Sequence, residues 1–285
     1  MPVPQQPPNP TPSMCAISRR CAVMALASLG LPARAGLAEL MQAVRPAVVA
    51  VGNYQPLRSP RFQFHGTGFA IGDGRLVVTN AHVLRPPRAA EPGAASSPAP
   101  APGAVAEPLE QVAVVPAGRD PREWRLATVV AREPGLDLAL LRLEGSPLPA
   151  LELADSEAVR AGQEIAFVGY PIAGVLGLEP AIHRGIVAAV TAMAEPSTTA
   201  NQLDARRVAR LRAGNLRVFQ LDATAYPGNS GSPLLDVASG RVVGVVNSVL
   251  VKGTKESVLA QPSGITYAIP ANQIAELLRQ VPGSR

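Results

Sequence analysis

Gly228-Asn229-Ser230-Gly231-Ser232-Pro233 is the most informative stretch of this 285-residue chain. A serine hydroxyl acts as a nucleophile only beside a base, and the oxyanion formed on attack needs hydrogen-bond donors that are already in place. Glycines next to a serine let the backbone turn its N–H groups toward one point. A Gly-x-Ser-Gly segment alone also fits an ordinary turn, so its meaning depends on the rest of the chain.

A base for this serine is available at His82, one of three histidines. His82 follows the apolar stretch 76–78 and lies where a strand is expected to end in a loop, a position from which a rigid scaffold presents a side chain. His65 and His183 lie in strand-like segments, where a packed or solvated imidazole is the ordinary interpretation. Asp137 abuts an apolar segment, where a buried carboxylate needs a hydrogen-bond partner, and an imidazole N–H would be one.

Short β-rich runs separated by turn residues begin at residue 47, the pattern of an all-β sandwich or barrel. The expected strands are 47–52, 62–71, 75–79, 111–115, 124–131 and 138–143, then 164–169, 182–191, 216–221, 242–249 and 265–269. Two groups of about six strands indicate two barrels, one over about 47–145 and one over about 150–270, joined by the proline-containing connection 146–149. The segment 271–280 is predicted as a C-terminal helix, because Ile274, Leu277 and Leu278 share one face.

The order His82, Asp137, Ser230, with these local contexts, resembles the chymotrypsin-like serine proteases, and specifically the bacterial HtrA/Deg group of trypsin-like peptidases. Other segments carry the same resemblance, which spans about residues 47–280: GTGF at 66–69, 154–171, RGIV at 184–187 and TYAIP at 266–270. It implies an all-β fold of two six-stranded antiparallel barrels. The order and the residues after Ser230 argue against an α/β-hydrolase, which would need Gly-x-Ser-x-Gly and the order Ser, Asp, His.

The resemblance also implies a role for each residue in peptide-bond hydrolysis. Ser230 would attack the scissile carbonyl, His82 would take its proton, and Asp137 would orient the imidazole. The N–H groups of Gly228 and Ser230 would form the oxyanion hole. The pocket for the residue before the scissile bond would be lined by Thr224, Ala225, Tyr226, Val246, Asn247 and Ser248. Because Thr224 is not acidic, we expect a preference for small to medium aliphatic residues rather than Lys or Arg.

Composition and charge limit the classes of protein and of binding partner that fit this chain. The chain is 47% apolar and 16% charged, which excludes wholesale disorder, and no apolar run reaches the roughly 18 residues of a membrane span. The net charge of +5 comes from scattered arginines without interleaved aromatics, which disfavours nucleic-acid binding. No HExxH or P-loop motif is present, and the resemblance requires neither metal nor cofactor. Polypeptides, including unfolded proteins, are the expected partners.

The first 35 residues are typical of an export signal. Arg19 and Arg20 precede an apolar stretch at 21–31 and the small-x-small site 33–35. We therefore expect a protease domain over 36–285 that is exported to the bacterial periplasm or beyond. The Sec and twin-arginine routes both stay open, as do Met1 and Met14 as the start. Removing three of the 26 basic residues with this segment leaves 23 against 21 acidic ones, a net charge of +2, and removes both cysteines.

The sequence departs from the HtrA group in several places. About fifteen residues follow Pro270 in this sequence, so we expect a protease domain without the PDZ domain that most members of the group carry. Ser232 stands where the group commonly carries glycine. A proline-rich insertion covers 85–108 and a polar, arginine-containing segment covers 195–214, both expected as loops. Residues 37–44 could form an oligomer contact or a short helix on their own barrel. A catalytically weak chaperone or scaffold, and a dedicated processing protease, remain as alternatives to a quality-control endopeptidase.

Overall fold

The computed structural model describes residues 36–84, 110–192, 217–247 and 264–281. The chain divides into two units, 1–34 and 35–285, and all described residues belong to the second. The expected export signal, the insertions at 85–108 and 195–214, and Ser248 therefore lie outside the described residues.

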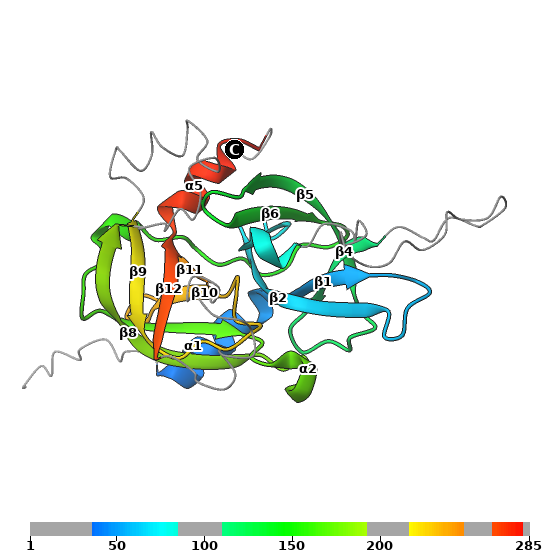
Figure 1. Cartoon of the computed structure of the whole chain (residues 1–285), viewed down its shortest axis with the longest axis horizontal. Helices are drawn as coiled ribbons and strands as arrows, with labels where there is room; N and C mark the ends of the chain where they lie inside the picture. The colour runs from blue at the N-terminus through cyan, green and yellow to red at the C-terminus, as the bar shows by residue number, and fades with distance from the viewer. Residues whose placement is uncertain (1–35, 85–109, 193–216, 248–263, 282–285) are drawn as a thin grey trace, which may run out of the picture. The chain divides into compact units, whose positions relative to one another are not determined.

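Two closed antiparallel barrels of six strands each make up the second unit (Figure 1). The first has the order β1-β2-β3-β6-β5-β4 and the second β10-β11-β12-β9-β8-β7. The strands of the first are β1 (Val48–Tyr54), β2 (Phe62–Ile71), β3 (Leu76–Asn80), β4 (Gln111–Pro116), β5 (Arg125–Glu133) and β6 (Leu138–Leu143). Those of the second are β7 (Glu164–Gly169), β8 (Ala181–Ala192), β9 (Arg217–Asp222), β10 (Pro233–Asp236), β11 (Val242–Asn247) and β12 (Ile265–Pro270). The predicted all-β, two-barrel fold is confirmed.

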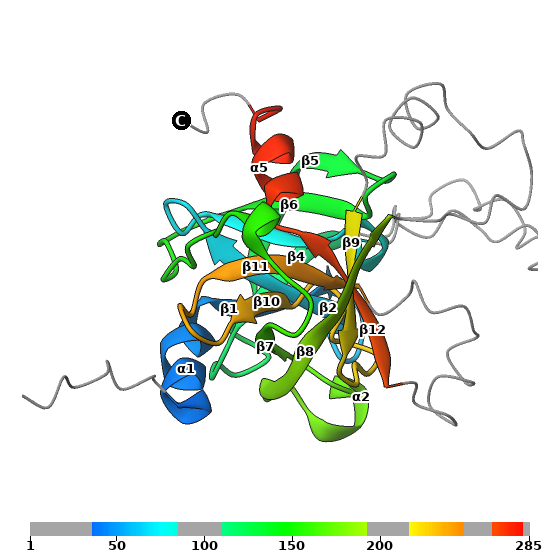
Figure 2. The same ribbon diagram turned by 90° about the vertical axis from the view of Figure 1, so that its left-hand side faces the viewer.

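The helices of the described segments are short. They are α1 (Leu37–Val44), α2 (Ala173–Leu176) and α5 (Asn272–Leu278), with 3-10 turns η1 (Arg45–Ala47), η2 (Ala81–Val83) and η3 (Ser156–Ala158). Helix α5 follows β12 and lies beside β5 and β6 (Figure 2). None of the helices in the described part of the chain is long and apolar enough to cross a membrane.

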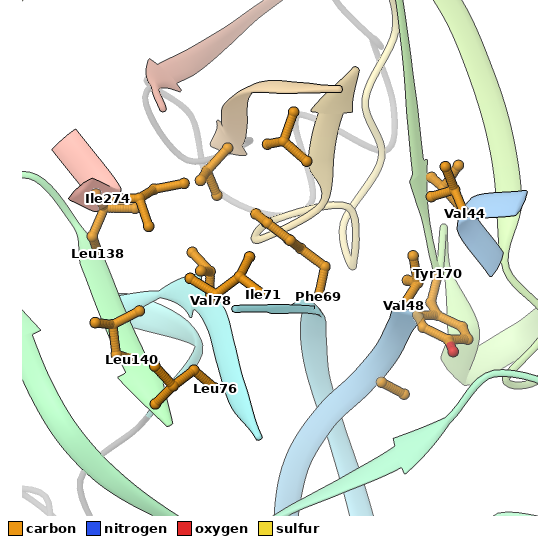
Figure 3. Close-up of a cluster of buried hydrophobic side chains, with 14 of the residues drawn as sticks. Val44, Val48, Phe69, Ile71, Leu76, Val78, Leu138, Leu140, Tyr170 and Ile274 are labelled. Carbon is orange, nitrogen blue, oxygen red and sulfur yellow. The ribbon is translucent and has the colours of Figure 1, made fainter. Parts of the chain in front are cut away.

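Most core strands bury both of their faces, and β1 shows why. Val48 and Ala50 join a cluster between the barrels, whereas Val49 and Val51 point into the first barrel. Figure 3 shows part of the cluster between the barrels, with Val48 beside Tyr170. Successive side chains of a strand point to opposite faces, so a strand with two buried faces reads as a continuous apolar run.

Three features differ from the sequence expectations or complete them. Strand β10 was not predicted; proline is tolerated there because it is the first residue of the strand. Trp124 lies just outside β5 and stacks on Tyr54 with ring centroids 3.7 Å apart. Helix α1 buries Leu40 and Val44 in the chain's own core, so this segment does pack on its own barrels.

Candidate active site

His82 and Asp137 form the first half of the site. His82 lies in η2, directly after β3, and its Nδ1 is 2.5 Å from Asp137 Oδ2. The backbone N–H of His82 donates to Asp137 Oδ1 at 2.8 Å. Both side chains remain open to solvent, with 31% and 23% of their surface exposed. One carboxylate thus holds the imidazole through both the side chain and the main chain of His82.

The backbone of Asp137 is fixed as firmly as its side chain. Its φ of +52° falls in the left-handed region, which aspartate adopts more readily than most residues. Its carbonyl oxygen accepts hydrogen bonds from Ala81 N–H and Asn80 Nδ2, both at 3.0 Å. Arg132 donates to the carbonyls of Ala81 at 2.8 Å and Leu84 at 3.2 Å. The turn that carries His82 is therefore tied to β5 and to the start of β6.

Asn247 is a residue of the site whose contact was not predicted. It ends β11 of the second barrel, is 2% exposed, and donates from Nδ2 to Asp137 Oδ2 at 2.8 Å. The Asp137 carboxylate thus accepts hydrogen bonds from both barrels. One sequence signal could have revealed this: a lone asparagine at the end of an apolar strand, because a buried amide needs a partner.

Ser230 lies in a turn between β9 and β10 that is fastened to the first barrel through Thr67 of β2. The N–H of Thr67 donates to the Ser230 carbonyl at 2.8 Å, and its Oγ1 donates to the Gly228 carbonyl at 2.6 Å. The Thr67 carbonyl accepts from Thr79 Oγ1 at 2.7 Å. Thr67 belongs to the GTGF motif of residues 66–69, but its bridging contact depends on how the two barrels meet.

Close packing at Gly66 brings the His82 turn and the Ser230 turn together. A Cβ at Gly66 would lie 2.7 Å from Val83 Cγ2 and 3.0 Å from the Ser230 carbonyl oxygen. Val83, which follows His82 in the chain, and the carbonyl of Ser230 therefore both pack against the same residue of β2. All three residues of the predicted triad lie at this junction of the barrels.

The Pro227–Gly228 peptide is held in one orientation. The Pro227 carbonyl accepts a hydrogen bond from Ile172 N–H at 2.8 Å. In a trans peptide the N–H points away from the carbonyl, so Gly228 N–H is directed away from Ile172. It has no acceptor among the described residues. Gly228 has φ +103°, a conformation that favours glycine, and a Cβ there would lie 2.2 Å from the Tyr170 carbonyl oxygen.

Ser232 fits beside Gly169, the last residue of β7. A Cβ at Gly169 would lie 2.0 Å from Ser232 Oγ and 2.8 Å from Asn229 Oδ1. Both oxygens are buried without a hydrogen-bond partner among the described residues. The Ser232 hydroxyl occupies the space that a side chain at residue 169 would need, so glycine at 169 makes room for it.

The expected pocket residues differ in their surroundings. Thr224, Ala225 and Tyr226 precede the Ser230 turn and are half-buried. The side chain of Val246 belongs to the core of the second barrel. The side-chain amide of Asn247 donates a hydrogen bond to Asp137 Oδ2. Ser248 lies outside the described residues. No group of three or more His, Cys, Asp or Glu side chains able to hold a metal ion exists in the described part of the chain.

Two six-stranded barrels, with a His–Asp pair and a serine-bearing turn at the junction between them, define the chymotrypsin-like class of proteins. The model of the family described as a trypsin-like peptidase domain matches residues 66–245. The chain belongs to this family.

Similar proteins carry protease names. A "Probable periplasmic serine endoprotease DegP-like" of Halomonas elongata is 27% identical over 217 residues, covering 75% of this chain and 35% of that protein. The mitochondrial serine protease HTRA2 of Bos taurus is 30% identical over 257 residues, covering 86% and 43%. The HtrA-type protease AlgW with tripeptide has a similar fold, with a TM-score of 0.58 and 22% identity over 86% of this chain and 63% of that one. The chain spans less than half the length of these two curated relatives.

Proposed function

We propose that the chain is a serine endopeptidase that hydrolyses polypeptides through an acyl-enzyme. The observation that carries this proposal is the His82–Asp137 pair, with Nδ1 and Oδ2 2.5 Å apart, at the junction where the turn of Ser230 is fastened by Thr67. The protease names of the relatives support the same activity.

In the proposed reaction Ser230 Oγ attacks the scissile carbonyl carbon while His82 Nε2 takes the hydroxyl proton. Asp137 accepts from His82 Nδ1–H, which leaves Nε2 as the base and stabilises the imidazolium that forms. The negative charge on the carbonyl oxygen is stabilised by the N–H groups of Gly228 and Ser230, each contributing on the order of 3 kcal/mol to the transition state. The imidazolium returns its proton to the leaving amine, and water then releases the acid by the same steps.

The first residue before the scissile bond is proposed to be small or medium aliphatic. The wall formed by Thr224, Ala225 and Tyr226 carries no charge that would pair with Lys or Arg. The nearest acidic residue in sequence, Asp222, ends β9 and is exposed, next to Ile186 and Ile265 on the neighbouring strands. A peptide library digested by the protein tests this; cleavage only after basic residues would contradict it.

Unfolded or damaged proteins of the bacterial cell envelope are the proposed substrates. The support is the word periplasmic in the names of several relatives, together with the export-signal pattern of residues 1–35. The bovine relative is named mitochondrial, so the shared activity does not depend on one compartment. Fractionation of the source cells, with detection of the protein in periplasm or medium, tests the location.

Labelling by a fluorophosphonate, together with hydrolysis of casein, tests the activity. Wild type should be labelled at Ser230 and should hydrolyse casein, whereas Ser230→Ala should lose labelling and about a million-fold in turnover. Ser232→Ala is the matched control, because it removes another hydroxyl from the same turn, two residues after Ser230. This variant should still be labelled at Ser230. Equal casein hydrolysis by wild type and Ser230→Ala would reject the mechanism. A folded wild type without labelling or turnover would favour the chaperone or scaffold alternative.

A further inference from the structure

The turn of Ser230 is held by several elements, and one of its contacts involves a titratable side chain. The backbone of the turn is anchored by Ile172 N–H on the Pro227 carbonyl and by Thr67 on the carbonyls of Gly228 and Ser230. These bonds do not change with pH near neutrality. The side chain between the two expected oxyanion donors, Asn229, contacts His183: the two nitrogens, Asn229 Nδ2 and His183 Nε2, are 3.4 Å apart.

Asn229 lies at the centre of the turn. Its N–H donates to the Tyr226 carbonyl and its carbonyl accepts from Ser232 N–H, both at 3.0 Å. Its side chain has no exposed surface, and its Oδ1 has no partner in the described part of the chain. The imidazole of His183 is thus the hydrogen-bond partner that the described residues offer to this amide.

His183 is held in place by its aromatic neighbours. It is paired in register with Phe167 across β7 and β8, and the two rings stack with centroids 4.8 Å apart and an interplanar angle of 15°. The Tyr226 ring lies 6.2 Å away on the side of the turn. Stacking on Phe167 orients the ring, but it does not require a nitrogen at the edge that meets Asn229.

We propose that His183 is a positioning residue for the oxyanion hole: its neutral imidazole accepts a hydrogen bond at Nε2 from Asn229 Nδ2 and thereby holds the turn of Gly228 and Ser230. This proposal rests on the proposed protease activity for its kinetic consequence. The bond requires the tautomer with the proton on Nδ1, because a nitrogen that carries a proton cannot accept one.

Protonation of His183 would break this contact. Nε2 would then become a donor facing another donor, Asn229 Nδ2. In the described part of the chain, the imidazole faces the ring of Phe167, the phenol of Tyr226 and the amide of Asn229. Burial lowers the pKa of His183 below its ordinary value. The turn is therefore held at neutral pH and loosens as the pH falls through this lowered pKa.

The charged residue next in sequence does not compensate a cationic His183. Arg184 points to the opposite face of β8, since side chains alternate along a strand, and its Nη2 is paired with Glu164 Oε1 at 2.5 Å. This makes Arg184→Gln a matched control: it changes the neighbouring residue and one charge without touching the turn.

Kinetics of two substitutions test the consequence for catalysis. His183→Phe keeps the stacking but has no acceptor, and we expect kcat to fall about fivefold, as for the loss of one ordinary hydrogen bond, with KM unchanged. His183→Gln offers an acceptor that does not titrate, so it should lose less activity. Because glutamine does not titrate, the kcat/KM of His183→Gln should fall with acidity less steeply than the kcat/KM of wild type and of Arg184→Gln. Unchanged kcat in His183→Phe with superimposable pH profiles would overturn the proposal.

Nuclear magnetic resonance tests the contact without any need for turnover. The chain has three histidines, so the imidazole nitrogens can be assigned by substituting each one. At pH 7.5 Nε2 of His183 should be unprotonated, and the amide signals of Gly228 and Ser230 should shift with the titration of His183 but not in His183→Gln. A proton on Nε2 of His183 would overturn the proposal even in a protein that proved inactive. Amide signals of Gly228 and Ser230 that do not shift during the titration of His183 would overturn it as well. Absence of fluorophosphonate labelling alone would instead reject the protease function.

Discussion

Asn247 offers the sharpest test of how the two barrels share the site. Replacing it by leucine keeps a branched side chain in a position that is 2% exposed, but removes the amide that donates to Asp137 Oδ2 at 2.8 Å. A hydrogen bond to a charged group is worth about 1.5 to 3 kcal/mol. Because 23% of the Asp137 side chain is exposed, water can replace part of the lost bond, so the lower end applies. About 1.5 kcal/mol corresponds to about a tenfold loss in kcat/KM.

The measurement is the initial rate of cleavage of a fluorogenic peptide, together with the urea midpoint of each variant. The matched control is Asn272→Leu, because Asn272 also donates from Nδ2 to a carboxylate, Asp155 Oδ1, at 2.9 Å, but lies at the start of α5. This control should lose stability and keep its kcat/KM. A folded Asn247→Leu variant within twofold of wild type, or an equal loss of activity in Asn272→Leu, would refute the reasoning.

Three further predictions each concern a single residue, namely Gly169, Ile172 and Asp155. Gly169→Ala should lower the free energy of unfolding by about 1 to 3 kcal/mol in a urea titration, because its Cβ would lie 2.0 Å from Ser232 Oγ; the loss should shrink in a Ser232→Gly background. Ile172 has φ +47°, a conformation that asparagine adopts more readily than isoleucine. Ile172→Asn should therefore raise the free energy of unfolding by about 1 kcal/mol, seen as a higher urea midpoint. A lower midpoint would contradict the strain assigned to Ile172. The side-chain hydrogen bond from Asn272 lowers the pKa of Asp155. The stabilisation of the fold by this bond is therefore present above the pKa of an unfolded aspartate, about 3.9, and is lost as the pH falls through the pKa of folded Asp155. The urea midpoints of wild type and Asn272→Leu should converge below the folded pKa, and a constant difference between them would argue against the contact.

Most strands were predictable because their signal is local. Apolar runs such as 76–78, ended by turn residues, are typical of strands whatever the tertiary arrangement. Strand β10 was missed because its four residues follow directly from the Ser230 turn and begin with Pro233, which weakens the strand signal. Helix α1 stayed open between two alternatives, since an amphipathic segment shows only that one face is covered, and here Leu40 and Val44 are covered by the chain's own core.

The sequence by itself determined the class of fold and the chemistry available to it. The hexapeptide around Ser230, the histidine after a strand and the aspartate before another were recognisable from residue types and their order, because each satisfies a local requirement. Only the tertiary structure decided how these groups are held: Asn247 on Asp137, Thr67 across the barrels and His183 against Asn229. Those partners lie more than forty residues apart in the chain, and their hydrogen bonds depend on the meeting of strands and barrels that no local pattern encodes.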